Sequence, residues 1–85
     1  MWKITDDFIS TDKERRDLVG LMSWDWDETR AQKARHSFLL FDDDRRVYFR
    51  GVSTSISFAP LDNLGEAYGC TYIKYLNNQG KYEVL

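Results

Sequence analysis

Residues 38–49 read FLLFDDDRRVYF, and this stretch decides the fold. Its two ends, Phe38–Phe41 and Val47–Phe49, are short apolar segments rich in the aromatic and branched residues that are typical of strands. Between them lie three aspartates and two arginines. Short carboxylate side chains favour turns because they accept hydrogen bonds from nearby backbone amides. The stretch therefore predicts an antiparallel hairpin.

A second hairpin is predicted at residues 71–85. Thr71–Leu76 consists mostly of β-branched and aromatic residues, and Asn77–Gly80 has the Asn and Gly composition of a tight turn. Lys81–Leu85 then returns as a strand. Both hairpins join neighbouring strands, so the sheet is expected to be antiparallel.

The first residues also alternate in the manner of a strand. Trp2 and Ile4 are separated by polar residues, which is the two-residue period of a half-buried strand extending toward Ile9. Gly51 marks either a bulge or the end of strand pairing. Residues 59–65 have the composition of an ordered loop, in which Pro60 excludes a central strand.

Residues 10–26 allow two interpretations. Thr11 followed by Glu14 fits a capping box, which favours a helix over about residues 11–23. Alternatively, residues 10–17 form a loop and Leu18–Trp26 a strand. We favour the strand, because Trp24 and Trp26 alternate with aspartates. Glu28–Arg35 contains good helix formers and predicts a helix of about two turns.

Together these segments predict a mainly β fold in one domain, residues 1–85. We expect a compact antiparallel sheet of about five or six short strands with one minor helix. The alternative is an α+β domain with a helix near residues 11–23.

Composition narrows the class of protein. Hydrophobic residues make up 42% of the chain, which is too many for intrinsic disorder, and the formal net charge is −2. A binder of the phosphate backbone usually carries a positive excess, so nucleic acid is not the expected partner. Cys70 is the single cysteine and cannot form an internal disulfide. With no signal-peptide pattern and no apolar run of membrane-spanning length, we expect a cytoplasmic protein without membrane contact.

Three features of the sequence are candidates for chemistry: His36, Cys70 and the aspartate run 42–44. His36 and Cys70 would form a catalytic dyad only if the fold brought them together; we expect a surface histidine and a buried cysteine instead. Asp42, Asp43 and Asp44 have no calcium-loop spacing, so a solvated turn is favoured over a metal site. We therefore predict no catalytic, cofactor or metal-binding residues, and a protein that is not an enzyme.

Residues 24–28, WDWDE, offer the best candidate for binding. In an extended segment the indoles of Trp24 and Trp26 would lie on one face. They would pack in the core, contact a protein partner or hold a small ligand, and the core is the preferred interpretation. As a candidate site we name both tryptophans as partner-binding residues. The basic clusters at 15–16, 30–35 and 45–46 are interpreted as solvated faces, most of them locally neutralised by neighbouring acids.

Several segments carry a resemblance to a family: residues 2–5, 38–44, 47–51, 57–62 and 69–75. Together they resemble a group of small bacterial proteins of similar length to which no activity is attached. In that group a glycine more often follows the aspartate run, where this chain has Arg45. The resemblance implies a bacterial or mobile-element origin and no particular chemistry.

The functional expectation is a small binding module that acts on a protein partner or on itself. High aromatic content and an unpaired terminal strand edge favour this interpretation. The alternative is nucleic-acid binding, or inhibition of a machine that processes nucleic acid, suggested by the charged clusters and the implied mobile-element origin.

Overall fold

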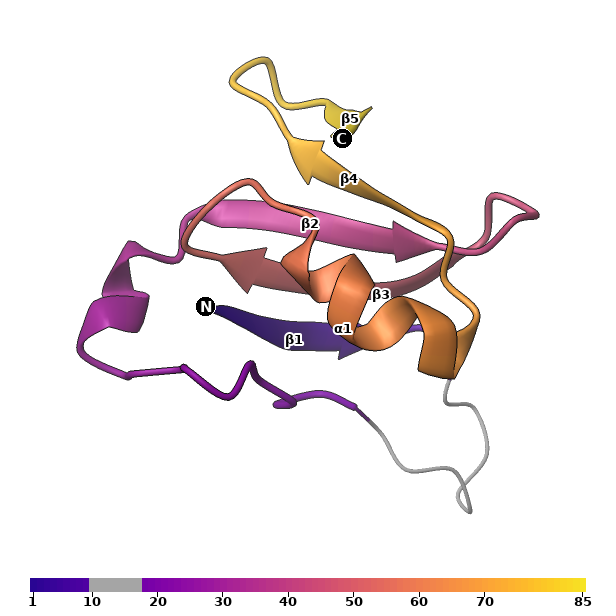
Figure 1. Cartoon of the computed structure of the whole chain (residues 1–85). Helices are drawn as coiled ribbons and strands as arrows, with labels where there is room; N and C mark the ends of the chain where they lie inside the picture. The colour runs from indigo at the N-terminus through magenta and orange to yellow at the C-terminus, as the bar shows by residue number, and fades with distance from the viewer. Residues whose placement is uncertain (10–17) are drawn as a thin grey trace.

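Five antiparallel strands form one sheet in the order β1-β3-β2-β4-β5 (Figure 1). The computed structural model describes residues 1–9 and 18–85. The elements are β1 (Trp2–Asp7), the 3₁₀ helix η1 (Arg30–Lys33), β2 (His36–Phe41), β3 (Val47–Ser53), α1 (Ala59–Tyr68), β4 (Tyr72–Leu76) and β5 (Tyr82–Val84). The mainly β prediction is confirmed, with five strands.

Both predicted hairpins are present. β2 pairs with β3, with Leu40 opposite Phe49, and β4 pairs with β5, with Tyr75 opposite Glu83. β2 also pairs with β4, which places it at the centre of the sheet. The apolar run 38–41 is therefore flanked by strands on both sides.

One face of the sheet forms the core. Helix α1 lies across this face (Figure 1). Alternate side chains of the four long strands are buried there, and α1 adds Leu64 to them. The completely buried ones are Ile4, Phe38, Leu40, Phe49 and Ile73. These strands alternate as expected for a sheet that is covered on one side.

Helix α1 corrects the prediction of a loop at residues 59–65. Pro60 lies in the first turn, where its missing amide hydrogen costs nothing, and Gly69 ends the helix in the left-handed conformation at φ 78°. Pro60 and Leu64 are buried. Residues of low helical propensity therefore form a helix here because its apolar side packs on the sheet.

Gly51 lies within β3 at a crowded point. It pairs with Ile4 on one side and Phe38 on the other, and the β1 register shifts between Ile4 and Asp6 beside it. A Cβ atom at Gly51 would lie 2.5 Å from the carbonyl oxygen of Lys3. Of the two alternatives for Gly51, a bulge is present beside it, with the extra residue in β1, and pairing does not end there but continues to Ser53.

The predicted strand over Leu18–Trp26 is wrong. The segment makes one isolated bridge to β1, between Met22 and Lys3. Around it, the Ile4 amide donates to Leu21 at 2.8 Å and the Ser23 amide donates to Trp2 at 2.9 Å. Gly20, with φ 93°, and the turn that follows Ser23 prevent a regular ladder.

The alternative helix near residues 11–23 is not formed at residues 18–23, and its remainder falls on residues 10–17, outside the described residues. The helix predicted over Glu28–Arg35 is the single short turn η1. Within the described part of the chain, no helix has the length and apolar character needed to span a membrane.

Candidate functional site

The face of the sheet opposite α1 carries the candidate site, which we call the open face. Residues paired across antiparallel strands point to the same side, so the register defines its members. They include Lys3, Asp6, Ser37, Leu39, Phe41, Arg50, Val52, Tyr72, Lys74, Leu76, Tyr82 and Val84. Of the two described helices, α1 packs its buried residues on the core face and η1 has none. No described helix therefore covers the open face.

The open face is apolar at its centre and charged around it. One cross-strand row runs Asp6, Arg50, Leu39, Lys74 and Val84 through all five strands. Leu39 is half-buried between the two cations, which are its cross-strand neighbours on either side. Val84, at the sheet edge, is 62% exposed.

Aromatic rings organise the neighbouring row. The rings of Phe41 and Tyr72 stack with centroids 4.9 Å apart and an angle of 2°. The Lys74 ammonium lies 5.1 Å from the centre of the Phe41 ring. Such contacts attract a cation to the negative face of the ring, so the ammonium has a favoured position.

A hollow of about 400 Å³ lies at one side of this face. Tyr72, Lys74 and Val84 line it, and Asp43 and Arg45 from the β2–β3 turn form the rest of its wall. Asp43 and Arg45 carry opposite charges, which leaves Lys74 as the unbalanced charge among the lining residues. The hollow is suited to an apolar side chain that is followed by an anionic group.

The structure separates the two tryptophans that the sequence places together. Trp24 is 95% exposed at the centre of a turn, in which the Trp26 amide donates to Ser23 at 3.1 Å. Trp26 is half-buried; its Nε1 donates to Glu28 at 3.1 Å, and the Lys3 ammonium lies 5.6 Å from its ring. The preferred core interpretation is wrong for both, because the turn directs the first indole away from the sheet.

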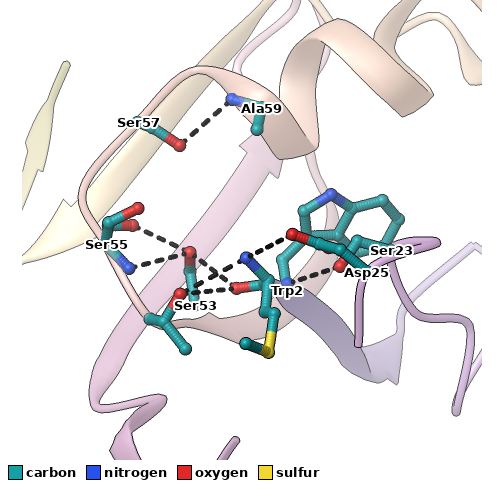
Figure 2. Close-up of polar contacts among 9 residues, drawn as sticks. Trp2, Ser23, Asp25, Ser53, Ser55, Ser57 and Ala59 are labelled. Carbon is teal, nitrogen blue, oxygen red and sulfur yellow. Dashed lines mark hydrogen bonds and ion pairs between the residues drawn. The ribbon is translucent and has the colours of Figure 1, made fainter. Parts of the chain in front are cut away.

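A network of hydroxyl groups lies between the sheet and residues 23–26, which we call the tryptophan segment (Figure 2). The Trp2 amide donates to the Ser23 hydroxyl at 3.0 Å, and Ser53 Oγ donates to the Met1 and Ser55 carbonyls. The Ser23 hydroxyl, together with the amino group of Met1, lowers the pKa of Asp25. The network therefore positions residues 23–26 beside β1 without a regular strand.

His36 and Cys70 do not meet. His36 opens β2, whereas Cys70 lies beyond its other end, where the Thr71 amide donates to Phe41 at 2.8 Å. A strand of this length separates the two ends by about 17 Å. Burial raises the pKa of the Cys70 thiol to about 11, so the thiol stays protonated at neutral pH. Cys70 is buried, as predicted.

The aspartate run forms the predicted turn, but Asp42 is buried rather than solvated. Its Oδ1 accepts hydrogen bonds from the backbone amides of Arg46 at 2.8 Å and Asp44 at 2.9 Å. These bonds and the Tyr48 hydroxyl lower the pKa of Asp42. Burial, and then Asp42, raise the pKa of Tyr48. Asp42 therefore stabilises the turn of the β2–β3 hairpin, in which Arg45 adopts the left-handed conformation at φ 64°.

The sequence analysis missed the charged residues of the open face. Lys3, Arg50 and Lys74 come from three strands and form no cluster along the chain. The available signal was the alternation Ile73-Lys74-Tyr75, which places a lysine opposite two buried residues. The arginines noted in the sequence lie outside the strands of this face. Arg45 and Arg46 are in the β2–β3 turn, where Arg45 lines the hollow, Arg30 is at η1, and Arg15 and Arg16 lie outside the described residues.

Comparison with known proteins gives no match: no family model, no curated protein and no solved structure is significantly similar to this chain.

Proposed function

We propose that this protein is a non-enzymatic binding module that docks a protein partner on the open face of its sheet. The observation that carries the proposal is the apolar centre of this face, with Leu39, Phe41 and Tyr72 half-buried and no described helix over them. A sheet buries apolar side chains on a face by packing that face against another layer of structure. A partner would supply that layer.

The exposed indole of Trp24 supports the same proposal. Tryptophan is enriched among the residues that dominate binding energy at protein interfaces, because it offers a large, rigid contact area. Trp26, beside Lys3, connects the tryptophan segment to the open face. We therefore keep Trp24 and Trp26 as proposed partner-binding residues, with Trp24 as the anchor and Trp26 as part of the rim.

A non-enzymatic role agrees with the placement of the reactive groups. His36 and Cys70 lie at opposite ends of β2, and the pKa of the Cys70 thiol is raised rather than lowered. A nucleophilic cysteine needs the opposite shift. A buried free thiol also agrees with a reducing compartment, and we place the protein in the cytoplasm on this ground.

Site-specific photo-crosslinking tests the proposal. The photoreactive residue p-benzoylphenylalanine replaces Leu76 on the open face in one variant and the exposed Asn63 on α1 in a matched control, each expressed in the natural host cells. Illumination is expected to give a discrete adduct from position 76 only. The adduct should be degraded by protease and resist nuclease.

Each other outcome argues against the proposal. Adducts from position 63 alone, or equally from both positions, would place the interface elsewhere. A nuclease-sensitive adduct would make the partner a nucleic acid. Absence of any adduct from position 76, in a variant whose thermal unfolding matches the parent protein, would remove the open face as a docking surface.

A further inference from the structure

The open face has a charge opposite to that of the rest of the chain. Lys3, Arg50 and Lys74 stand against the single carboxylate of Asp6, which leaves a formal charge of +2 on this face. The whole chain has a net charge of −2, so everything outside the face sums to −4. The positive charge is therefore concentrated where the apolar surface is.

Two of the three cations have no anionic partner among the described residues. Arg50 Nε pairs with Asp6 at 2.9 Å, and the only other described ion pair joins the Met1 amino group to Asp25. Lys3 and Lys74 instead lie over the rings of Trp26 and Phe41. Both ammonium groups are thus positioned by aromatic contacts and remain available to an external carboxylate.

This charge disfavours a second copy of the chain as the occupant. Two open faces stacked on each other would bring like charges together, which costs free energy at an interface. The footprint is also small: five strands about 4.8 Å apart and five residues of about 3.3 Å each cover on the order of 400 Å². A stable interface buries about 800 Å² on each partner.

The same features favour a protein over single-stranded nucleic acid. Binding of a phosphate backbone depends on many cations, and this face offers two that are unpaired. Base stacking also needs a free aromatic surface. Phe41 is already contacted by both the Tyr72 ring and the Lys74 ammonium.

We propose that the open face recognises an acidic segment of a protein partner, in which carboxylates contact Lys3 and Lys74 and an apolar side chain fills the hollow beside Tyr72. Lys3 on β1 and Lys74 on β4 are separated by three inter-strand spacings and two residues along the strands, about 16 Å, so an extended acidic segment of about five residues reaches from one to the other. This inference rests on the proposed function and adds the chemistry of the partner.

Binding to defined polymers tests the inference on the full chain. The probes are a random glutamate–tyrosine copolymer, a lysine–tyrosine copolymer and a short oligothymidylate, each titrated at low salt and followed by backbone amide chemical shifts. Only the glutamate–tyrosine copolymer is expected to bind, with shifts confined to open-face residues. Lys74→Glu should weaken this binding about tenfold or more, because a favourable contact becomes a repulsive one.

Lys81→Glu is the matched control, since it makes the same charge change at an exposed residue of the β4–β5 turn. It should change the affinity less than twofold. An equal loss in both variants would indicate non-specific attraction to net charge and overturn the inference, as would tighter binding of the oligothymidylate or the lysine copolymer. If the open face cross-links to a partner in cells but binds no acidic polymer, the proposed function stands and the acidic partner is wrong.

Discussion

At the scale of single residues, close packing leaves no room for a side chain at certain positions. Gly65 lies inside α1, where glycine normally destabilises a helix relative to alanine. Here the backbone that follows the helix packs closely against Gly65. The Cys70 amide donates to the Gly65 carbonyl at 2.9 Å, so the chain folds back against the helix. A Cβ atom at Gly65 would lie 2.8 Å from the Cys70 carbonyl oxygen.

Gly65→Ala is therefore expected to destabilise the protein, by about 1–3 kcal/mol, although helical propensity alone predicts a gain of about 1 kcal/mol. The reason is the contact with backbone, which cannot rotate away as a side chain would. Urea unfolding measures the change. Asn63→Ala, at an exposed position of the same helix, is the control and should be neutral or stabilising. A stabilised Gly65→Ala variant would contradict the packing of α1 against Cys70.

At the scale of elements, the β2–β3 hairpin depends on one carboxylate. Asp42 accepts hydrogen bonds from two backbone amides within its own turn and receives the Tyr48 hydroxyl. These bonds are stronger to the ionised form, and they lower the pKa of Asp42 below the usual 3.8. Since the pKa is lower in the folded state, the ionised carboxylate stabilises the hairpin above the unfolded pKa, and this contribution is lost as the pH falls through the folded value.

The expected result is a pH-dependent difference between the parent protein and Asp42→Asn. The variant should melt at a lower temperature at neutral pH. The two melting temperatures should converge as the pH falls from about 3.8 through the lower pKa of the folded state, because the folded parent carboxyl is then protonated as well. Melting curves by circular dichroism across the acid range measure this. Asp43→Asn, at the exposed next position, should follow the parent curve. A constant offset for Asp42→Asn at all pH values would show that ionisation is not involved.

At the scale of the whole molecule, the two faces of the sheet shield their apolar residues from water in different ways. The core face buries its apolar residues under α1. The open face keeps comparable residues half-buried and surrounds Leu39 with long cationic side chains. Exposed apolar patches promote association, and charges of one sign around them oppose it. On the proposed function, we expect the lysines to oppose stacking of two copies of this chain while they leave the face accessible to an acidic partner.

Removing these charges should make the protein self-associate. The double variant Lys3→Leu/Lys74→Leu is expected to show a sedimentation coefficient that rises with protein concentration, whereas the parent stays monomeric, because an apolar surface without repulsion is then free to stack. Lys33→Leu/Lys81→Leu makes the same composition change at exposed positions outside the open face and should behave as the parent. A parent protein that is already dimeric would contradict the role assigned to the lysines.

Local patterns of the sequence were sufficient for the sheet itself. Alternation of apolar and polar residues predicted the strand beginning near Trp2, and runs of apolar, aromatic and branched residues predicted those near Phe38, Val47 and Tyr72. The aspartate run and the Asn- and Gly-containing turn predicted both hairpins. Such patterns succeed because strand alternation and turn chemistry act between residues close together in the chain.

What only the tertiary structure decided depends on contacts between distant residues. α1 contains Pro60 and Gly65 and forms because Leu64 packs on the sheet. Residues 18–26 make a single bridge to β1, because Gly20 and the turn after Ser23 prevent a regular ladder. The open face likewise exists only once three strands place Lys3, Arg50 and Lys74 on the same side of the sheet. A sequence pattern records which way a side chain points, whereas strand order determines which side chains become neighbours.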